Sequence, residues 1–137
     1  MVKSTGIYQG GYNCELTHGP SGLVIETDAP KDNQGRGAAF SPTDLTAASL
    51  GSCMVTTMAI VAKQKFGTDI PGLRWEVTKE MSADKPRRIV RLAVEIWLPF
   101  SKAKDPEGVL EQAALNCPVA LSLHPSVEKP VTFHWEG

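Results

Sequence analysis

The chain has 137 residues, of which 42% are hydrophobic, and its 14 basic and 15 acidic residues give a formal net charge of -1. This length predicts a single domain over residues 1–137, and the hydrophobic content excludes a disordered or low-complexity chain. A charge so close to zero excludes bulk electrostatic attraction to nucleic acid or anionic lipid, so we expect neither as a partner.

The first forty residues carry strand and loop signals. Strands are expected around residues 12–17 and 23–27, and a loop is expected over residues 28–40 because that segment is rich in Pro, Asp, Asn and Gly. The N-terminus lacks the apolar core that a secretory signal requires. We therefore expect a cytoplasmic protein.

A long helix is predicted after this loop. Ser41 suits an N-cap, Pro42 suits the first helical position, and Asp44 places negative charge in the first turn. The helix should end near Phe66, and its residues 45–62 contain no charge. Those 18 residues reach the lower limit for a membrane span, but their Ser, Thr and Gly content favours a helix buried on nearly every side at the centre of the fold.

The second half of the chain alternates between strand and helix signals. Apolar and polar residues alternate over 73–78 and 90–98, and the polar segment 81–88 between them predicts an antiparallel hairpin. A second helix is expected from Asp105, and Pro118 either ends it or begins a short following helix through Leu123. A last strand is expected over 131–135, and this order of elements predicts an α+β fold.

Cys53 lies about three turns into the uncharged helix, in the run Ser-Leu-Gly-Ser-Cys-Met. A buried free cysteine commonly packs as a small hydrophobic residue. However, Gly51 costs a helix about 1 kcal/mol relative to alanine, so the small residues Gly51 and Ser52 indicate that something approaches closely here.

A nucleophilic thiol must ionise, and Cys53 is too far along the helix for its dipole to help. A cation or hydrogen-bond donor would have to come from elsewhere, although any arginine can equally be a solvated surface charge. The candidates are Arg36 in the preceding loop, His18, and the basic group Arg87, Arg88 and Arg91.

The other cysteines leave several interpretations open. Three cysteines in a reducing compartment favour free thiols over structural disulfides. Cys117, just before Pro118, either packs in the core or takes part in disulfide cycling with another cysteine. Cys14 and His18 share one face of a strand, but two ligands do not make a zinc site, and with only His124 and His134 remaining we expect no metal. Phosphate-loop and hydrolase motifs are absent, so no cofactor is expected.

Two segments together resemble the paired cysteine motifs of the OsmC/Ohr family, the osmotically inducible and organic hydroperoxide resistance group. They are residues 41–53, Ser-Pro-Thr-Asp-Leu-Thr-Ala-Ala-Ser-Leu-Gly-Ser-Cys, and residues 116–120, Asn-Cys-Pro-Val-Ala. The resemblance extends over nearly the whole chain. It implies an antiparallel sheet wrapped around two central helices, in an intertwined homodimer with active sites near the subunit interface.

The resemblance also implies a thiol-dependent peroxidase without metal or flavin. Cys53 would attack an organic hydroperoxide or hydrogen peroxide, Cys117 would condense with it to a disulfide, and a dithiol or dithiol protein would reduce that disulfide. The chain departs from the peroxidase pattern at Pro20, where an arginine is expected, and at Thr43, where a glutamate is expected.

Two other residues are candidates for the missing roles. Arg36 is the candidate for the arginine, and Asp44, one position after Thr43, is the candidate for the carboxylate. The departures keep a second hypothesis open, in which the protein is a non-catalytic dimeric binding protein with an apolar cavity at the subunit interface.

Overall fold

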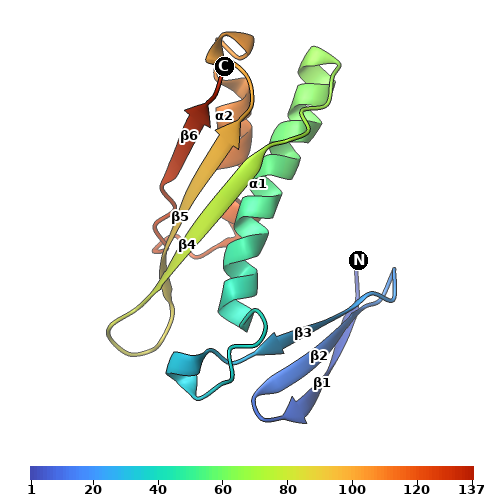
Figure 1. Ribbon diagram of the computed structural model, residues 1–137, viewed down its shortest axis with the longest axis vertical. Coiled ribbons are helices and arrows are strands. Elements are labelled where there is room, and N and C mark those ends of the chain that lie inside the picture. Colours follow the sequence, from blue (N-terminus) through green and yellow to red (C-terminus); the bar gives the residue numbers. More distant parts are fainter. The chain divides into compact units, whose positions relative to one another are not determined.

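The computed structural model describes all 137 residues, and they divide into two compact units, Met1–Thr46 and Ala47–Gly137. Figure 1 labels strands β1 to β6 and helices α1 and α2. Each unit contains one three-stranded sheet. The α+β class is therefore confirmed, while the assignment of residues 1–137 to a single domain stays a prediction.

The first unit is built on an antiparallel meander. Its strands are β1 (Ser4–Gly10), β2 (Asn13–His18) and β3 (Val24–Asp28), followed by the short 3-10 helix η1 (Lys31–Asn33). The two predicted strands are β2 and β3, shifted by one residue. Strand β1 was not predicted because it contains Gly6 and Gly10 and no apolar alternation, and all of its residues are exposed.

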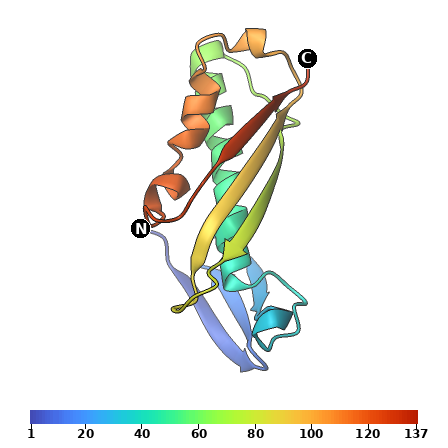
Figure 2. The same ribbon diagram turned by 90° about the vertical axis from the view of Figure 1, so that its left-hand side faces the viewer.

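The second unit has a mixed sheet with helices on one face (Figure 2). Its strands are β4 (Arg74–Met81), β5 (Ile89–Leu98) and β6 (Val131–Trp135). Its helices are α1 (Pro42–Phe66), η2 (Lys102–Lys104), α2 (Val109–Leu115) and α3 (Pro118–Ser122). Helix α1 begins within the last residues of the first unit. Strands β4 and β5 form the predicted hairpin. Strand β6 is parallel to β5, which corrects the expectation of a wholly antiparallel sheet. The physical reason is the long connection through α2 and α3, which returns the chain to the same end of the sheet.

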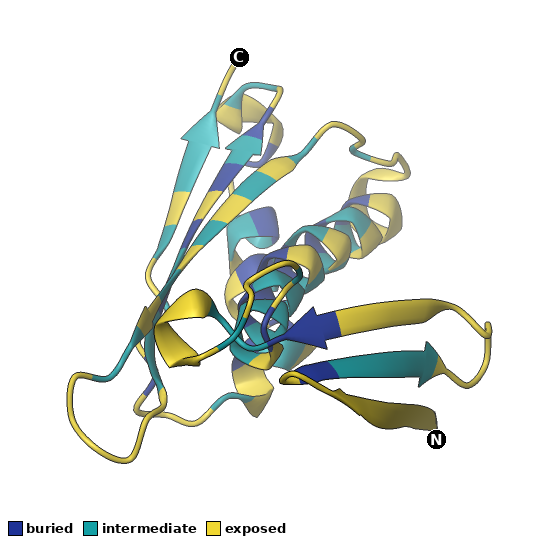
Figure 3. Cartoon of the chain, turned by 60° about the horizontal axis from the view of Figure 1, so that its bottom comes forward, coloured by how far each residue is buried: buried dark blue, intermediate teal, exposed yellow.

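The core of the second unit lies between one stripe of α1 and the inward face of β5. The buried stripe of α1 recurs at helical spacing, and alternate residues of β5 are buried opposite it (Figure 3). The members are Ala47, Leu50, Met54, Met58 and Ala62 on α1, and Leu92, Val94, Ile96 and Leu98 on β5.

The composition of α1 predicted a helix buried on nearly every side. In this chain, one side of α1 is exposed instead. Ser52, Thr56 and Ile60 follow one another at four-residue spacing and are exposed. The single chain covers only one stripe of the helix, because one sheet can contact only one side of it. By length and composition α1 could cross a membrane, but core helices of soluble proteins meet the same criterion, and its buried stripe fits a core helix.

The predicted helix boundaries depend on caps that the structure resolves. Ser41 Oγ accepts a hydrogen bond from the Asp44 backbone N–H at 3.0 Å, and an Asp44 carboxylate oxygen accepts from the Ser41 N–H at 3.1 Å, which confirms the predicted start. Helix α2 begins later than predicted. The buried Asp105 carboxylate accepts hydrogen bonds from the N–H groups of Val109 and Leu110, both at 2.9 Å. Asp105 therefore caps α2 from a position before the helix begins.

Pro118 begins α3, so the second of the two alternatives predicted for this proline is correct.

Candidate functional site

Cys53 lies on α1 and is half-buried against the core of the second unit. Thr57 lies one turn later, and its Oγ1 is 4.0 Å from the Cys53 sulfur. The Thr57 hydroxyl donates its hydrogen to the Cys53 carbonyl oxygen at 2.7 Å. Since a hydroxyl has one hydrogen, Thr57 presents a lone pair to the sulfur, and its contact orients the thiol rather than stabilising a thiolate.

Gly51 has a packing role. The indole ring of Trp75, which projects from β4, lies so close to the Gly51 backbone that an added Cβ would overlap it. Ser52, by contrast, is exposed. The small residues before Cys53 were predicted to allow a close approach, and at Gly51 the approaching group is a tryptophan from the same unit.

Cys117 is fully buried and occupies the N-cap position of α3. Its sulfur accepts a hydrogen bond from the Ala120 backbone N–H at 3.4 Å. Burial is the main cause that raises the pKa of the Cys117 thiol, and hydrogen bonding to the neighbouring Cys53 raises it further. The fold of the second unit therefore brings two distant cysteines together and keeps one of them protonated at neutral pH.

The two charged residues predicted to assist Cys53 have other recorded partners. Arg36 belongs to the first unit, where its Nη2 lies 3.3 Å from Asp28 Oδ1, and its side chain is 69% exposed. Asp44 exchanges hydrogen bonds with Ser41 at the start of α1. A part for Arg36 or Asp44 in thiol chemistry stays a prediction.

The remaining candidate cations are engaged mainly at the surface. Arg88 pairs with Asp84 at 3.2 Å, and Arg91 pairs with Glu80 and Glu128, both at 3.1 Å. In the first unit, His18 Nδ1 lies 2.6 Å from Ser21 Oγ. These contacts fit the interpretation of Arg88 and Arg91 as solvated charges on the hairpin.

Cys14 is a half-buried free thiol on β2 of the first unit. The chain contains no group of three or more His, Cys, Asp or Glu side chains that could hold a metal ion.

Asp28 anchors the loop that carries Arg36. The contribution of the Asp28 carboxylate to the stability of the folded protein should depend on pH. A hydrogen bond from Asn13 lowers the pKa of this buried carboxyl below its ordinary value, helped by Arg36 and the Ala38 N–H, while burial opposes them. A lowered pKa in the folded state means that the carboxylate stabilises the fold above about pH 4, and that this stabilisation is lost as the pH falls through the folded-state value.

We therefore expect Asp28→Asn to unfold at lower urea concentration than the wild type near neutral pH. Because the variant lacks the titrating group, the two midpoints should converge as the pH falls below about 4. Urea unfolding measured across this pH range checks the result, and a constant difference between the midpoints would contradict it.

Two residues of the site, Thr57 and Trp75, escaped the sequence analysis. Thr57 stands four positions after Cys53, a spacing that places both on one face of a helix, so this signal was available. The alternation over 73–78 puts Trp75 on the same face of its strand as Leu73 and Val77. Its pairing with Gly51 is a tertiary contact that no local pattern encodes.

Comparison with known proteins places these motifs in a family. The model of the OsmC-like protein family matches residues 34–130. A crystal structure from Psychrobacter arcticus 273-4, of a protein assigned to the osmotic stress induced and detoxification response, is 43% identical, with a TM-score of 0.90 over 98% of this chain and 96% of that one. No match was found among curated proteins.

More distant solved structures share the fold. An organic hydroperoxide resistance protein OsmC from Legionella pneumophila is 16% identical, with a TM-score of 0.78, over 98% of this chain and 96% of that one. An organic hydroperoxide resistance protein from Vibrio cholerae, with captopril bound in one active site, is 15% identical with a TM-score of 0.74, over 98% of this chain and 92% of that one.

Proposed function

Because this chain belongs to the OsmC-like family, we propose that it is a thiol-dependent peroxidase that reduces organic hydroperoxides or hydrogen peroxide through Cys53 and Cys117. The observation that carries the proposal is that Cys53 packs against the buried core cluster to which Cys117 belongs, close enough to affect the pKa of the Cys117 thiol. One of them, Cys53, is half-buried and reachable, whereas Cys117 is fully buried. Such a difference in exposure suits a nucleophile and a resolving thiol.

The chemistry requires only these sulfurs, the peroxide and a dithiol. The Cys53 thiolate attacks one peroxide oxygen, the O–O bond breaks, and the leaving alkoxide takes a proton to become an alcohol. Cys53 is thereby oxidised to a sulfenic acid. The Cys117 thiol then attacks that sulfur, an S–S bond forms and water leaves. A dithiol or dithiol protein supplies two electrons by thiol–disulfide exchange and restores both thiols.

The burial of Cys117 supports this assignment of roles. A thiol whose pKa is raised by burial holds little thiolate at neutral pH, so it reacts slowly with peroxide. A sulfenic acid on the adjacent Cys53 is a stronger electrophile and is held next to it. The structure thus favours Cys53 as the first thiol to be oxidised.

The test is a thiol count of the reduced protein before and after one equivalent of cumene hydroperoxide. Two of the three thiols should be lost, and mass spectrometry should find a peptide that joins Cys53 to Cys117. Cys14 serves as the internal control and should stay reduced. Three unchanged thiols would contradict the proposal and favour the non-catalytic binding protein, which the departures at Pro20 and Thr43 support.

We further propose a cytoplasmic homodimer. Large apolar side chains that each unit leaves exposed support the dimer, because exposed apolar surface commonly marks an interface. They include Ile7 and Tyr8 on β1, Val24 and Ile25 on β3, and Ile60 on α1. Light scattering on the eluted protein measures the mass, and a monomer at micromolar concentration would contradict the proposal.

A further inference from the structure

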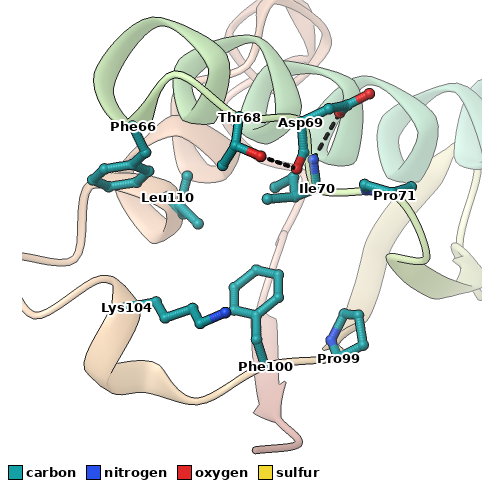
Figure 4. Close-up of a pocket in the computed structure, with 9 residues that line it drawn as sticks. All are labelled: Phe66, Thr68, Asp69, Ile70, Pro71, Pro99, Phe100, Lys104 and Leu110. Carbon is teal, nitrogen blue, oxygen red and sulfur yellow. Dashed lines mark hydrogen bonds between the residues drawn. The ribbon is translucent and has the colours of Figure 1, made fainter.

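A cavity of about 500 Å³ opens in the second unit, where α1 ends (Figure 4). Its volume falls in the range of small-molecule sites. Phe66, which lines it, comes 13 residues after Cys53 on α1, so the cavity is roughly 20 Å from the thiols along the helix axis. It is therefore separate from the proposed peroxidase site.

The cavity has two facing apolar walls. Figure 4 shows one wall formed by the end of α1, the loop that follows it and α2, and the other formed by the segment after β5 together with η2. The side chains are Phe66, Ile70, Pro71 and Leu110 on the first wall, and Pro99, Phe100 and Lys104 on the second.

Lys104 places an uncompensated positive charge at this cavity. Its ammonium nitrogen lies 5.7 Å from the centroid of the Phe100 ring, and it has no carboxylate partner. Lys102, on the same short helix η2, is paired with Glu111 at 3.4 Å. An ammonium beside apolar walls and without a counter-ion attracts an anionic group, because no carboxylate of the chain neutralises its charge.

The one acidic residue of the lining does not supply that counter-ion. A carboxylate oxygen of Asp69 accepts a hydrogen bond from the Ile70 backbone N–H at 2.7 Å. Figure 4 shows this carboxylate on the side of the cavity away from Lys104. Thr68 is also turned toward the backbone, since its hydroxyl donates to the Asp69 carbonyl oxygen at 3.2 Å.

We propose that this cavity binds a small amphipathic carboxylate. The apolar part of the ligand lies between the walls that carry Phe66 and Phe100, and its carboxylate pairs with the Lys104 ammonium. A cationic ligand is repelled by Lys104, and a neutral one gains only the apolar contact. The ligand class thus follows from a single cation placed beside apolar walls.

The proposal is tested by titrating the full-length protein, labelled with ¹⁵N, with sodium octanoate and separately with octan-1-ol. Octanoate should produce saturable shifts at the backbone amides of Thr68, Ile70 and Phe100, and octanol should bind more weakly. Lys104→Met should weaken octanoate binding about three- to fivefold, which is the effect of losing one exposed ion pair. Lys102→Met is the matched control and should bind octanoate as the wild type does.

Both lysines are exposed, so both variants should fold, and their thermal midpoints verify this. Equal binding of octanoate and octanol, with no effect of Lys104→Met, would overturn the proposed ligand class. Octanoate shifts confined to the exposed strands of the first unit, or no saturable shift in the cavity, would overturn the site. None of these outcomes depends on whether Cys53 reduces peroxides.

Discussion

Replacing Cys53 by serine is expected to abolish hydroperoxide consumption, whereas Cys117→Ser is expected to consume one equivalent of peroxide per subunit and then stop. Serine cannot form the thiolate that attacks the peroxide, so Cys53→Ser loses the first step and its rate should fall to that of protein-free solution. Cys117→Ser keeps the nucleophile but lacks the thiol that converts its sulfenic acid to a disulfide.

Consumption of cumene hydroperoxide in the presence of dithiothreitol measures turnover for each variant. A sulfenic-acid-specific reagent with mass spectrometry locates the trapped intermediate, which should appear on Cys53 only in Cys117→Ser. Cys14→Ser is the control, since Cys14 belongs to the first unit and the thiol pair to the second. Turnover that survives in Cys53→Ser, or that is lost in Cys14→Ser, would contradict the assignment.

Dithiothreitol itself can reduce the sulfenic acid of Cys117→Ser and sustain slow turnover. A single-turnover experiment without any reductant removes this ambiguity. There the wild type should lose two thiols and Cys117→Ser only one, and the fully buried position of Cys117 explains why it does not compete for the first peroxide.

The elements that could be predicted from the sequence are those fixed by local chemistry. Ser41 and Asp44 form a reciprocal cap, and such a cap needs only residues four or fewer apart. Strand β5 alternates between buried and more exposed residues because one face packs on the helices, so its period marks both the strand and its inward side. Strand β1 has no buried face in this chain and therefore no such period.

The elements that could not be predicted depend on contacts between distant segments. The parallel direction of β6 depends on the path of the chain through α2 and α3, which alternation within a strand does not encode. The proposed roles of Cys53 and Cys117 as a pair rest on the family resemblance and not on spacing, because the two cysteines lie 64 positions apart in the sequence. Likewise, the sequence predicted a close approach at Gly51, but only the structure identifies the approaching group as the Trp75 ring.

The contact between Gly51 and Trp75 predicts that alanine at position 51 destabilises the protein, whereas helix propensity alone predicts that it stabilises the protein. Alanine is favoured over glycine inside a helix by about 1 kcal/mol, so Gly51→Ala would be stabilising if α1 were exposed at this point. Because a Cβ there overlaps the Trp75 ring, we expect Gly51→Ala to destabilise the protein by about 1–3 kcal/mol, the usual cost of overpacking a core. The free energy of unfolding from urea denaturation measures this directly.

Ser52→Ala is the matched control, because Ser52 is the next residue on the same helix and is exposed. Its substitution should change the free energy of unfolding by no more than about 0.5 kcal/mol. The double variant Gly51→Ala with Trp75→Leu tests the mechanism, since a smaller side chain at 75 leaves room for the Cβ. If the contact with Trp75 is the cause, the two substitutions together should cost less than the sum of their separate effects. Additive effects would show that the cost of Gly51→Ala does not come from Trp75, and a Gly51→Ala variant as stable as the wild type would show that the indole ring can move away.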